Sequence, residues 1–100
     1  AYVNWNASNN VLNSSYGVSS VVDLSGNYTE ITFTTSFANT NYIAVAGPLP
    51  IPPGNNPFVL QELNTTGSPR SASKYVCYAN SAGSVPVILP ATIQLAFYSA

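Results

Sequence analysis

The chain has 100 residues, of which 46% are hydrophobic and only 5% are charged, and its formal net charge is −1. This length fits one domain, residues 1–100, and ordinary soluble domains carry about 25% charged residues. The absence of histidine, the single cysteine and the lack of any basic stretch argue against a zinc site, an intrachain disulfide and electrostatic binding of nucleic acid. Prolines interrupt the most apolar stretches, so we expect no membrane insertion.

So few charges leave Asn, Ser and Thr to form the wetted surface. Charged side chains normally keep apolar surface in solution, and their scarcity indicates that other chains cover much of this surface. We therefore expect the protein to assemble with identical subunits. The alternative is a neutral, polar monomer that works outside cells.

The first expected strand is residues 2–5, and a connection follows it to residue 13. The clearest pattern comes next: residues 28–35 alternate strictly, so that Ile31 and Phe33 fall on one buried face. Ser25-Gly26-Asn27 supplies a turn before this strand, which predicts a hairpin with Val18–Leu24. Asp23 and Glu30 could approach each other across such a hairpin, which makes a carboxylate pair conceivable, but two ordinary surface carboxylates are favoured.

Two unusual loops interrupt the middle of the chain, around expected strands at residues 42–46 and 58–63. The first, residues 47–57 (GPLPIPPGNNP), is stiff because each proline fixes its φ angle, and Asn55 and Asn56 lie at its tip. The second, residues 64–73 (NTTGSPRSAS), is polar and carries Arg70. Either loop could be organised in advance for binding, or could brace a neighbouring subunit.

Two strands are expected in the last third, at residues 74–79 and at Thr92–Tyr98, separated by a turn that starts near residue 80. Cys77 lies inside the first of them and is expected to be a buried, inert thiol, with an interchain bridge as the alternative. In the final strand the alternation places Ile93, Leu95 and Phe97 inward and Thr92, Gln94 and Tyr98 outward. About seven short strands and no helix predict an all-β protein, a small antiparallel β-sandwich.

Catalytic constellations are missing from the sequence. There is no histidine to act as a general base, only three carboxylates are present, and no glycine-rich phosphate loop occurs. We expect a protein that is not an enzyme, with no catalytic residue, no cofactor and no metal ion. Seven tyrosines and one tryptophan suit carbohydrate stacking, although most must form core or interface. The candidate ligand or receptor contacts are Asn55, Asn56, Arg70, Tyr75 and Tyr78.

Five short motifs occur along the chain: AYVNWN at residues 1–6, SYGVSS at 15–20, GNYT at 26–29, FTT at 33–35 and NY at 41–42. Together they resemble a module found at the C-termini of bacteriophage fibre and other virion proteins. The chain departs from the module at Tyr2, where Trp is usual, and residues 47–73 have no counterpart in it. The resemblance implies a homotrimer and architectural roles for Tyr16, Tyr28 and Tyr42.

The resemblance further implies a location on the virion, as the terminal module of a longer fibre or appendage protein. Its expected function is to trimerise and to present loops for attachment to a host-surface glycan or protein. The alternative is a purely structural domain that decorates a capsid or assembles a fibre and has no ligand. A small lectin or adhesin domain of cellular origin is a third reading.

Overall fold

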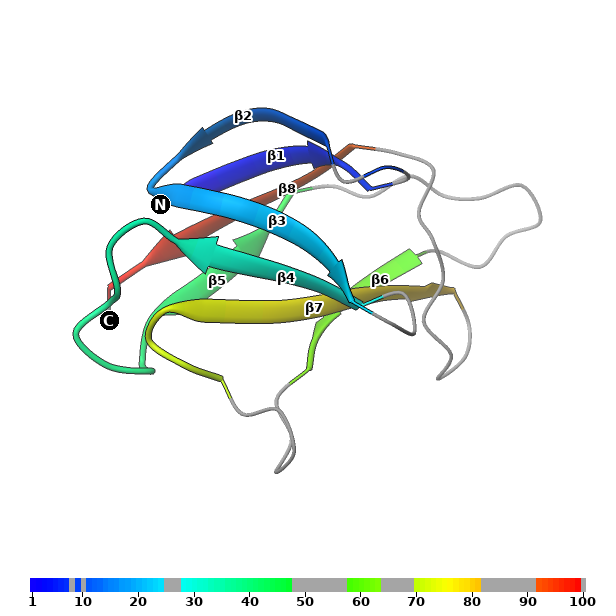
Figure 1. Ribbon diagram of the computed structural model, residues 1–100. Helices are drawn as coiled ribbons and strands as arrows, with labels where there is room; N and C mark the ends of the chain where they lie inside the picture. The colour runs from blue at the N-terminus through cyan, green and yellow to red at the C-terminus, as the bar shows by residue number, and fades with distance from the viewer. Residues whose placement is uncertain are drawn as a thin grey trace.

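The computed structural model describes residues 1–7, 9, 11–24, 28–47, 58–63, 70–81 and 92–99. This part of the chain contains strands and no helix. The eight strands, labelled in Figure 1, are β1 (Tyr2–Asn6), β2 (Val11–Tyr16), β3 (Val18–Leu24), β4 (Tyr28–Phe33), β5 (Ile43–Ala46), β6 (Phe58–Glu62), β7 (Lys74–Ser81) and β8 (Thr92–Tyr98). The expected all-β fold is confirmed, and no helix of the described residues is long and apolar enough to cross a membrane.

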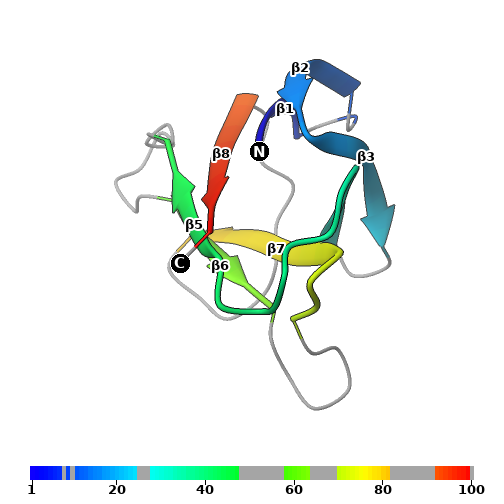
Figure 2. The same cartoon turned by 90° about the vertical axis from the view of Figure 1, so that its left-hand side faces the viewer.

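The strands form two antiparallel four-stranded sheets. Sheet A has the order β2-β1-β8-β5, and sheet B has the order β3-β4-β7-β6. The two sheets form separate layers, which are easiest to distinguish in Figure 2. The architecture is therefore sandwich-like, with the first and last strands of the chain side by side in the middle of sheet A.

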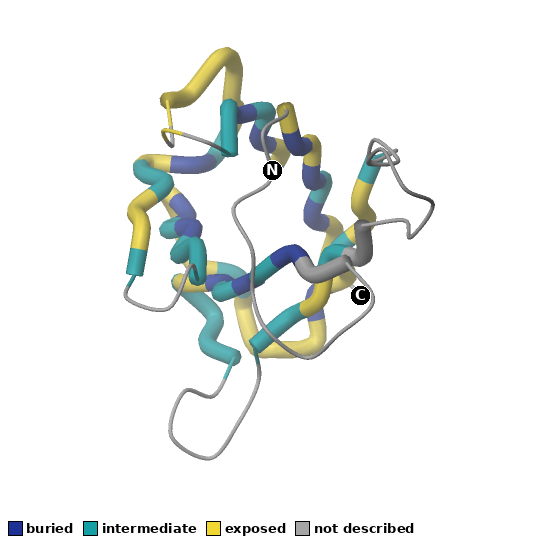
Figure 3. Tube along the Cα trace, turned by 90° about the vertical axis from the view of Figure 1, so that its right-hand side faces the viewer, coloured by how far each residue is buried: buried dark blue, intermediate teal, exposed yellow. Residues whose placement is uncertain are grey.

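Alternating side chains from both sheets fill the space between the layers. Along β8, Ile93, Leu95 and Phe97 are buried while Thr92, Gln94 and Tyr98 are exposed, as the sequence pattern predicts. Figure 3 shows the same alternation of buried and exposed positions along other strands. The ring centroid of Phe97 on sheet A lies 4.9 Å from that of Phe33 on β4 and 5.1 Å from that of Tyr75 on β7, both in sheet B. These aromatic contacts join the two layers.

Strand β2 corrects the expectation that residues up to 13 are only a connection. It pairs with β1 over its whole length, with an irregularity opposite Asn4 and Trp5. All six of its residues are exposed, so the strand has no buried face to produce an alternating pattern. Backbone pairing holds it at the edge of sheet A, and a pattern based on burial could not reveal it.

The chain passes from sheet A to sheet B at Gly17. This residue has a φ of +74°, and a Cβ there would lie 3.1 Å from the Cβ of Ala1. Glycine therefore fits both the backbone conformation and the available space. Because of this corner, β2 and β3 form edge strands of different sheets although only one residue separates them.

The predicted hairpin of β3 and β4 is confirmed by its register, which runs from Val18 opposite Phe33 to Leu24 opposite Tyr28. Strand β4 ends at Phe33 rather than at residue 35. The next residue, Thr34, donates its backbone amide hydrogen to the carbonyl of Gly17. The register does not form the conceivable carboxylate pair and agrees with the favoured interpretation, two separate carboxylates. Glu30 lies opposite Val22, one position away from Asp23, so the two carboxylates leave opposite faces of the sheet.

Candidate functional site

All five charged side chains belong to sheet B or to the segment that leads into β7. Asp23, Glu30, Glu62 and Lys74 lie on β3, β4, β6 and β7, and Arg70 precedes β7 by four residues. The four strands of sheet A carry no charged residue. Of these, Glu30 and Lys74 lie on the outer face of sheet B, whereas Asp23 and Glu62 lie on the face of Cys77, which points toward the core. The outer face of sheet B therefore carries charge, and that of sheet A carries none.

Sheet A also carries most of the large hydrophobic side chains that the described residues expose. Seven of the eight are on its strands, and Val22 on β3 is the exception; the seven are Tyr2, Val11, Leu12, Tyr16, Ile43, Val45 and Tyr98. Single exposed apolar residues are normal on a protein surface, but a group of them on one sheet is not. Six of the seven lie on the outer face of sheet A, and Leu12, opposite the buried Trp5, lies on its inner side. This outer face is the candidate interaction surface.

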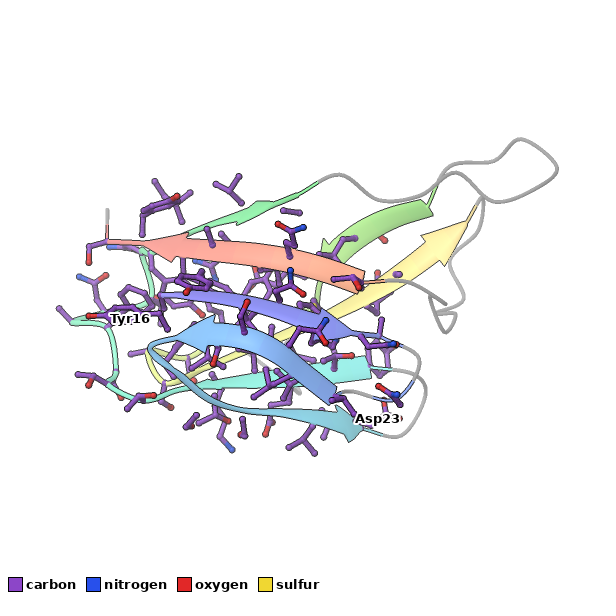
Figure 4. All side chains as sticks on the ribbon, turned by 90° about the horizontal axis from the view of Figure 1, so that it is seen from above. Tyr16 and Asp23 are labelled. Carbon is purple, nitrogen blue, oxygen red and sulfur yellow. The ribbon has the colours of Figure 1, made fainter. Side chains whose placement is uncertain are left out.

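Strand register places these side chains in rows. Tyr2 lies opposite Tyr16 on one side and opposite Ala96 on the other, and Ala96 lies opposite Val45, so one row crosses all four strands. The rings of Tyr2 and Tyr16 are stacked, with centroids 6.3 Å apart and an interplanar angle of 17°. A second pair, Ile43 of β5 opposite Tyr98 of β8, lies two residues beyond Ala96 along β8. Figure 4 labels Tyr16, the last residue of β2, and Asp23, near the end of β3, which lie toward opposite ends of the molecule.

A shallow hollow of about 380 Å³ lies beside this row. Its polar lining comes from Asn4, Ser14 and Gln94, and its apolar lining includes Tyr2 and Val45. The Asn4 and Gln94 side chains are on paired positions of β1 and β8, and Asn13 donates a 3.0 Å hydrogen bond to Asn4 Oδ1. The hollow therefore offers amide, hydroxyl and aromatic groups and no charge.

The outer face of sheet B has a different composition. Lys74 Nζ lies 3.3 Å from Glu30 Oε1, and Val22 faces Glu30 on the next strand. The rings of Tyr28 and Tyr78 meet edge to face with centroids 5.4 Å apart. The predicted ligand contact Tyr78 is therefore half-buried against another ring on this face. Exposed charges here keep the face hydrated.

Arg70, another predicted ligand contact, is engaged inside the fold. Its guanidinium donates to both carboxylate oxygens of Glu62, at 2.7 and 2.8 Å, and to the backbone carbonyls of Thr40 and Tyr42. It also lies 4.3 Å from the centre of the Tyr42 ring. The hydrogen bond to Glu62 raises the pKa of Arg70, so its charge is constant. These contacts tie the segment before β7 to the connection between β4 and β5.

Tyr75 and Cys77 point into the core from the same face of β7. Tyr75 is only 6% exposed, and burial raises its pKa well above 10.0, so little of its side chain is available to a ligand. Burial also raises the pKa of the Cys77 thiol from 9.0 to about 12, with a smaller contribution from Glu62. The expected buried thiol is confirmed, and it is far less reactive than an exposed one.

Asn55 and Asn56, at the tip of the proline-rich loop, lie outside the described residues. Their role as receptor contacts stays a prediction, and so does the role of residues 48–57 and 64–69. Tyr16 belongs to the motif that implies an architectural role. It is 72% exposed in the single chain, so this role stays a prediction.

Sequence reasoning did not find the outer face of sheet A. Its residues come from four separate parts of the sequence, and only the strand order unites them. The one available signal was that no charge occurs in residues 1–22 or 75–100.

No group of three or more metal-binding side chains occurs among residues 1–7, 9, 11–24, 28–47, 58–63, 70–81 and 92–99. The comparisons with known proteins returned no match: no protein-family model, no curated protein and no solved structure corresponds to this chain.

Proposed function

We propose that this chain is a non-enzymatic module of a bacteriophage fibre or appendage that assembles as a homotrimer and attaches to the host surface. The observation that carries the proposal is the uncharged, apolar outer face of sheet A. An isolated protein with six exposed large hydrophobic side chains on one face of a sheet is prone to association. Assembly with identical chains explains both this face and the scarcity of charge in the sequence.

The resemblance to virion fibre modules supports the rest of the proposal. Five residues of its motifs are buried: Val3, Trp5, Val18, Phe33 and Tyr42. Tyr42 also hydrogen-bonds the carbonyls of Ser71 and Lys74, which joins the connection after β4 to β7. Positions that define a fold are expected to be core positions of this kind.

Attachment to the host is assigned to the region around residues 47–57. Gly47, the only described residue of that region, donates its amide hydrogen to the carbonyl of Gln94 on β8. After the region, β6 begins with Phe58 opposite Ser81 at the end of β7. Three copies of a weak site raise the overall avidity by about 10²–10⁴ without any new contact. A homotrimer therefore suits attachment to a repeated surface glycan.

A binding assay on bacterial cells tests this function. Fluorescently labelled protein is incubated with a panel of bacterial strains, in parallel with an Asn55→Ala/Asn56→Ala double variant. We expect wild-type protein to bind at least one strain and the variant to bind more weakly while its assembled mass is unchanged. Failure of the wild-type protein to bind any strain favours the purely structural alternative, a domain that assembles a fibre or decorates a capsid.

A further inference from the structure

The outer face of sheet A is large enough to form a stable contact. Each tyrosine side chain presents about 150–250 Å² when fully exposed, so at their exposed fractions Tyr2, Tyr16 and Tyr98 together present roughly 350 Å². A standard interface takes about 800 Å² from each partner. The three tyrosines provide nearly half of that area, before the aliphatic side chains on the same strands are counted.

The composition of the face restricts its partner. With no charged residue on β1, β2, β5 or β8, nothing on it pairs with a phosphate backbone, an anionic lipid or an acidic peptide. Two copies of the same neutral face meet without like-charge repulsion. The apolar side chains also span the sheet from Val11 on one edge strand to Ile43 on the other. A single sugar in the 380 Å³ hollow would leave most of them uncovered.

The edge strands of sheet A lead to the same conclusion. Exposed edges are usually protected by charged residues or proline, which discourage unwanted pairing. Strand β2 (VLNSSY) and strand β5 (IAVA) contain neither. Edges of this kind are tolerated where another chain lies over or beside them.

We propose that the outer face of sheet A is the surface through which copies of this chain bind one another, with Tyr2, Tyr16 and Val45 at its centre. This inference rests on the oligomeric part of the proposed function and adds the face that makes the contact. The outer face of sheet B, which carries the exposed Lys74–Glu30 pair, remains in contact with water.

Two matched valines test the assignment. Val45 on β5 and Val22 on β3 are 51% and 46% exposed, each on the outside of its own sheet, so a lysine fits at either position without entering the core. We expect Val45→Lys to raise the dissociation constant of the assembly about tenfold or more, because the interface would bury an unpaired charge. Val22→Lys, which faces Glu30, should assemble like the wild-type protein.

Sedimentation from about 1 to about 100 µM measures the mass of both variants and the wild type, because assembly depends on concentration. Near-ultraviolet circular dichroism establishes that each variant is folded, and Tyr16→Ser provides a second, milder change on the same face. A Val45→Lys variant that assembles like wild type, or a Val22→Lys variant that dissociates, would overturn the assignment.

Other outcomes separate this inference from the proposed function. If the wild-type protein is monomeric and binds a neutral polysaccharide such as mannan, and Val45→Lys abolishes that binding, the face is a glycan site and not a contact between copies. If the variants behave as expected but no bacterial strain binds the protein, the assignment of the face stands and the attachment function fails.

Discussion

The two sheets bury equivalent inner faces against one core, but their outer faces have opposite character. The outer face of sheet A exposes three tyrosines and several aliphatic side chains and has no charged residue, whereas the outer face of sheet B carries Glu30 and Lys74. The inner faces follow from the needs of one folded chain. An outer face need only remain soluble, and charged residues usually help it to do so. The strands of sheet A have none, which is the basis of our proposal that copies of the chain cover this face.

The charges of sheet B are also unequal among themselves. Arg70 and Glu62 are about four-fifths buried and join through two short hydrogen bonds, whereas the Lys74 side chain is half exposed and makes one contact of 3.3 Å. Partly buried, bidentate pairs contribute to stability through their geometry, and exposed pairs contribute little. Sheet B therefore contains one structural ion pair and one that mainly hydrates the surface.

The largest effect is expected from a change in the core that both sheets share. Phe97 is 1% exposed, and its ring centroid lies 4.9 and 5.1 Å from those of two rings on sheet B, so Phe97→Ala should lower the free energy of unfolding by about 3–5 kcal/mol. Urea denaturation measures this loss. A loss below about 1 kcal/mol would show that the layers do not pack through this residue.

A smaller loss is expected from Arg70→Ala. The variant leaves the Glu62 carboxylate without its bidentate partner and removes the hydrogen bonds to the carbonyls of Thr40 and Tyr42. We expect the free energy of unfolding to fall by about 1.5–3 kcal/mol. An unchanged urea midpoint would mean that Arg70 is available for a ligand, as the sequence analysis expected.

Alkaline pH should weaken the core on the sheet B side. The Cys77 thiol stays neutral in the folded chain because its pKa is raised from 9.0 to about 12, whereas the unfolded chain loses this proton at the lower pH. Stability is therefore full below about pH 9 and falls as pH rises toward 12. At about pH 10 the loss is on the order of 1 kcal/mol. Urea titrations at pH 8 and 10 measure it, and Cys77→Ala should show a flatter pH dependence.

The smallest effect is expected at the exposed ion pair. Lys74→Ala removes a single contact to Glu30 and should change the free energy of unfolding by about 0–1 kcal/mol, less still in high salt. It serves as the control for Arg70→Ala, because both changes remove one positive charge near β7. A larger loss for Lys74→Ala than for Arg70→Ala would reverse the distinction between the two pairs.

The sequence predicts the strands that alternate between core and solvent, such as β4 and β8, and misses what does not alternate. Strand β2 has no buried residue and so no such pattern. Tyr75 was within reach of prediction: it lies two residues before Cys77, which was expected to be buried, and residues two apart on a strand share a face. The outer face of sheet A could not be predicted from the sequence, because it forms only when strands from the two ends of the chain pair with each other.

The central claim is that identical copies cover the outer face of sheet A, and covalent footprinting of tyrosines over a range of protein concentrations tests it most directly. We expect the labelling of Tyr2, Tyr16 and Tyr98 to fall as the protein assembles, and that of Tyr28 and Tyr78 on sheet B to stay constant. Equal labelling of Tyr16 in dilute and concentrated protein, at the level that 72% exposure implies, would contradict the claim.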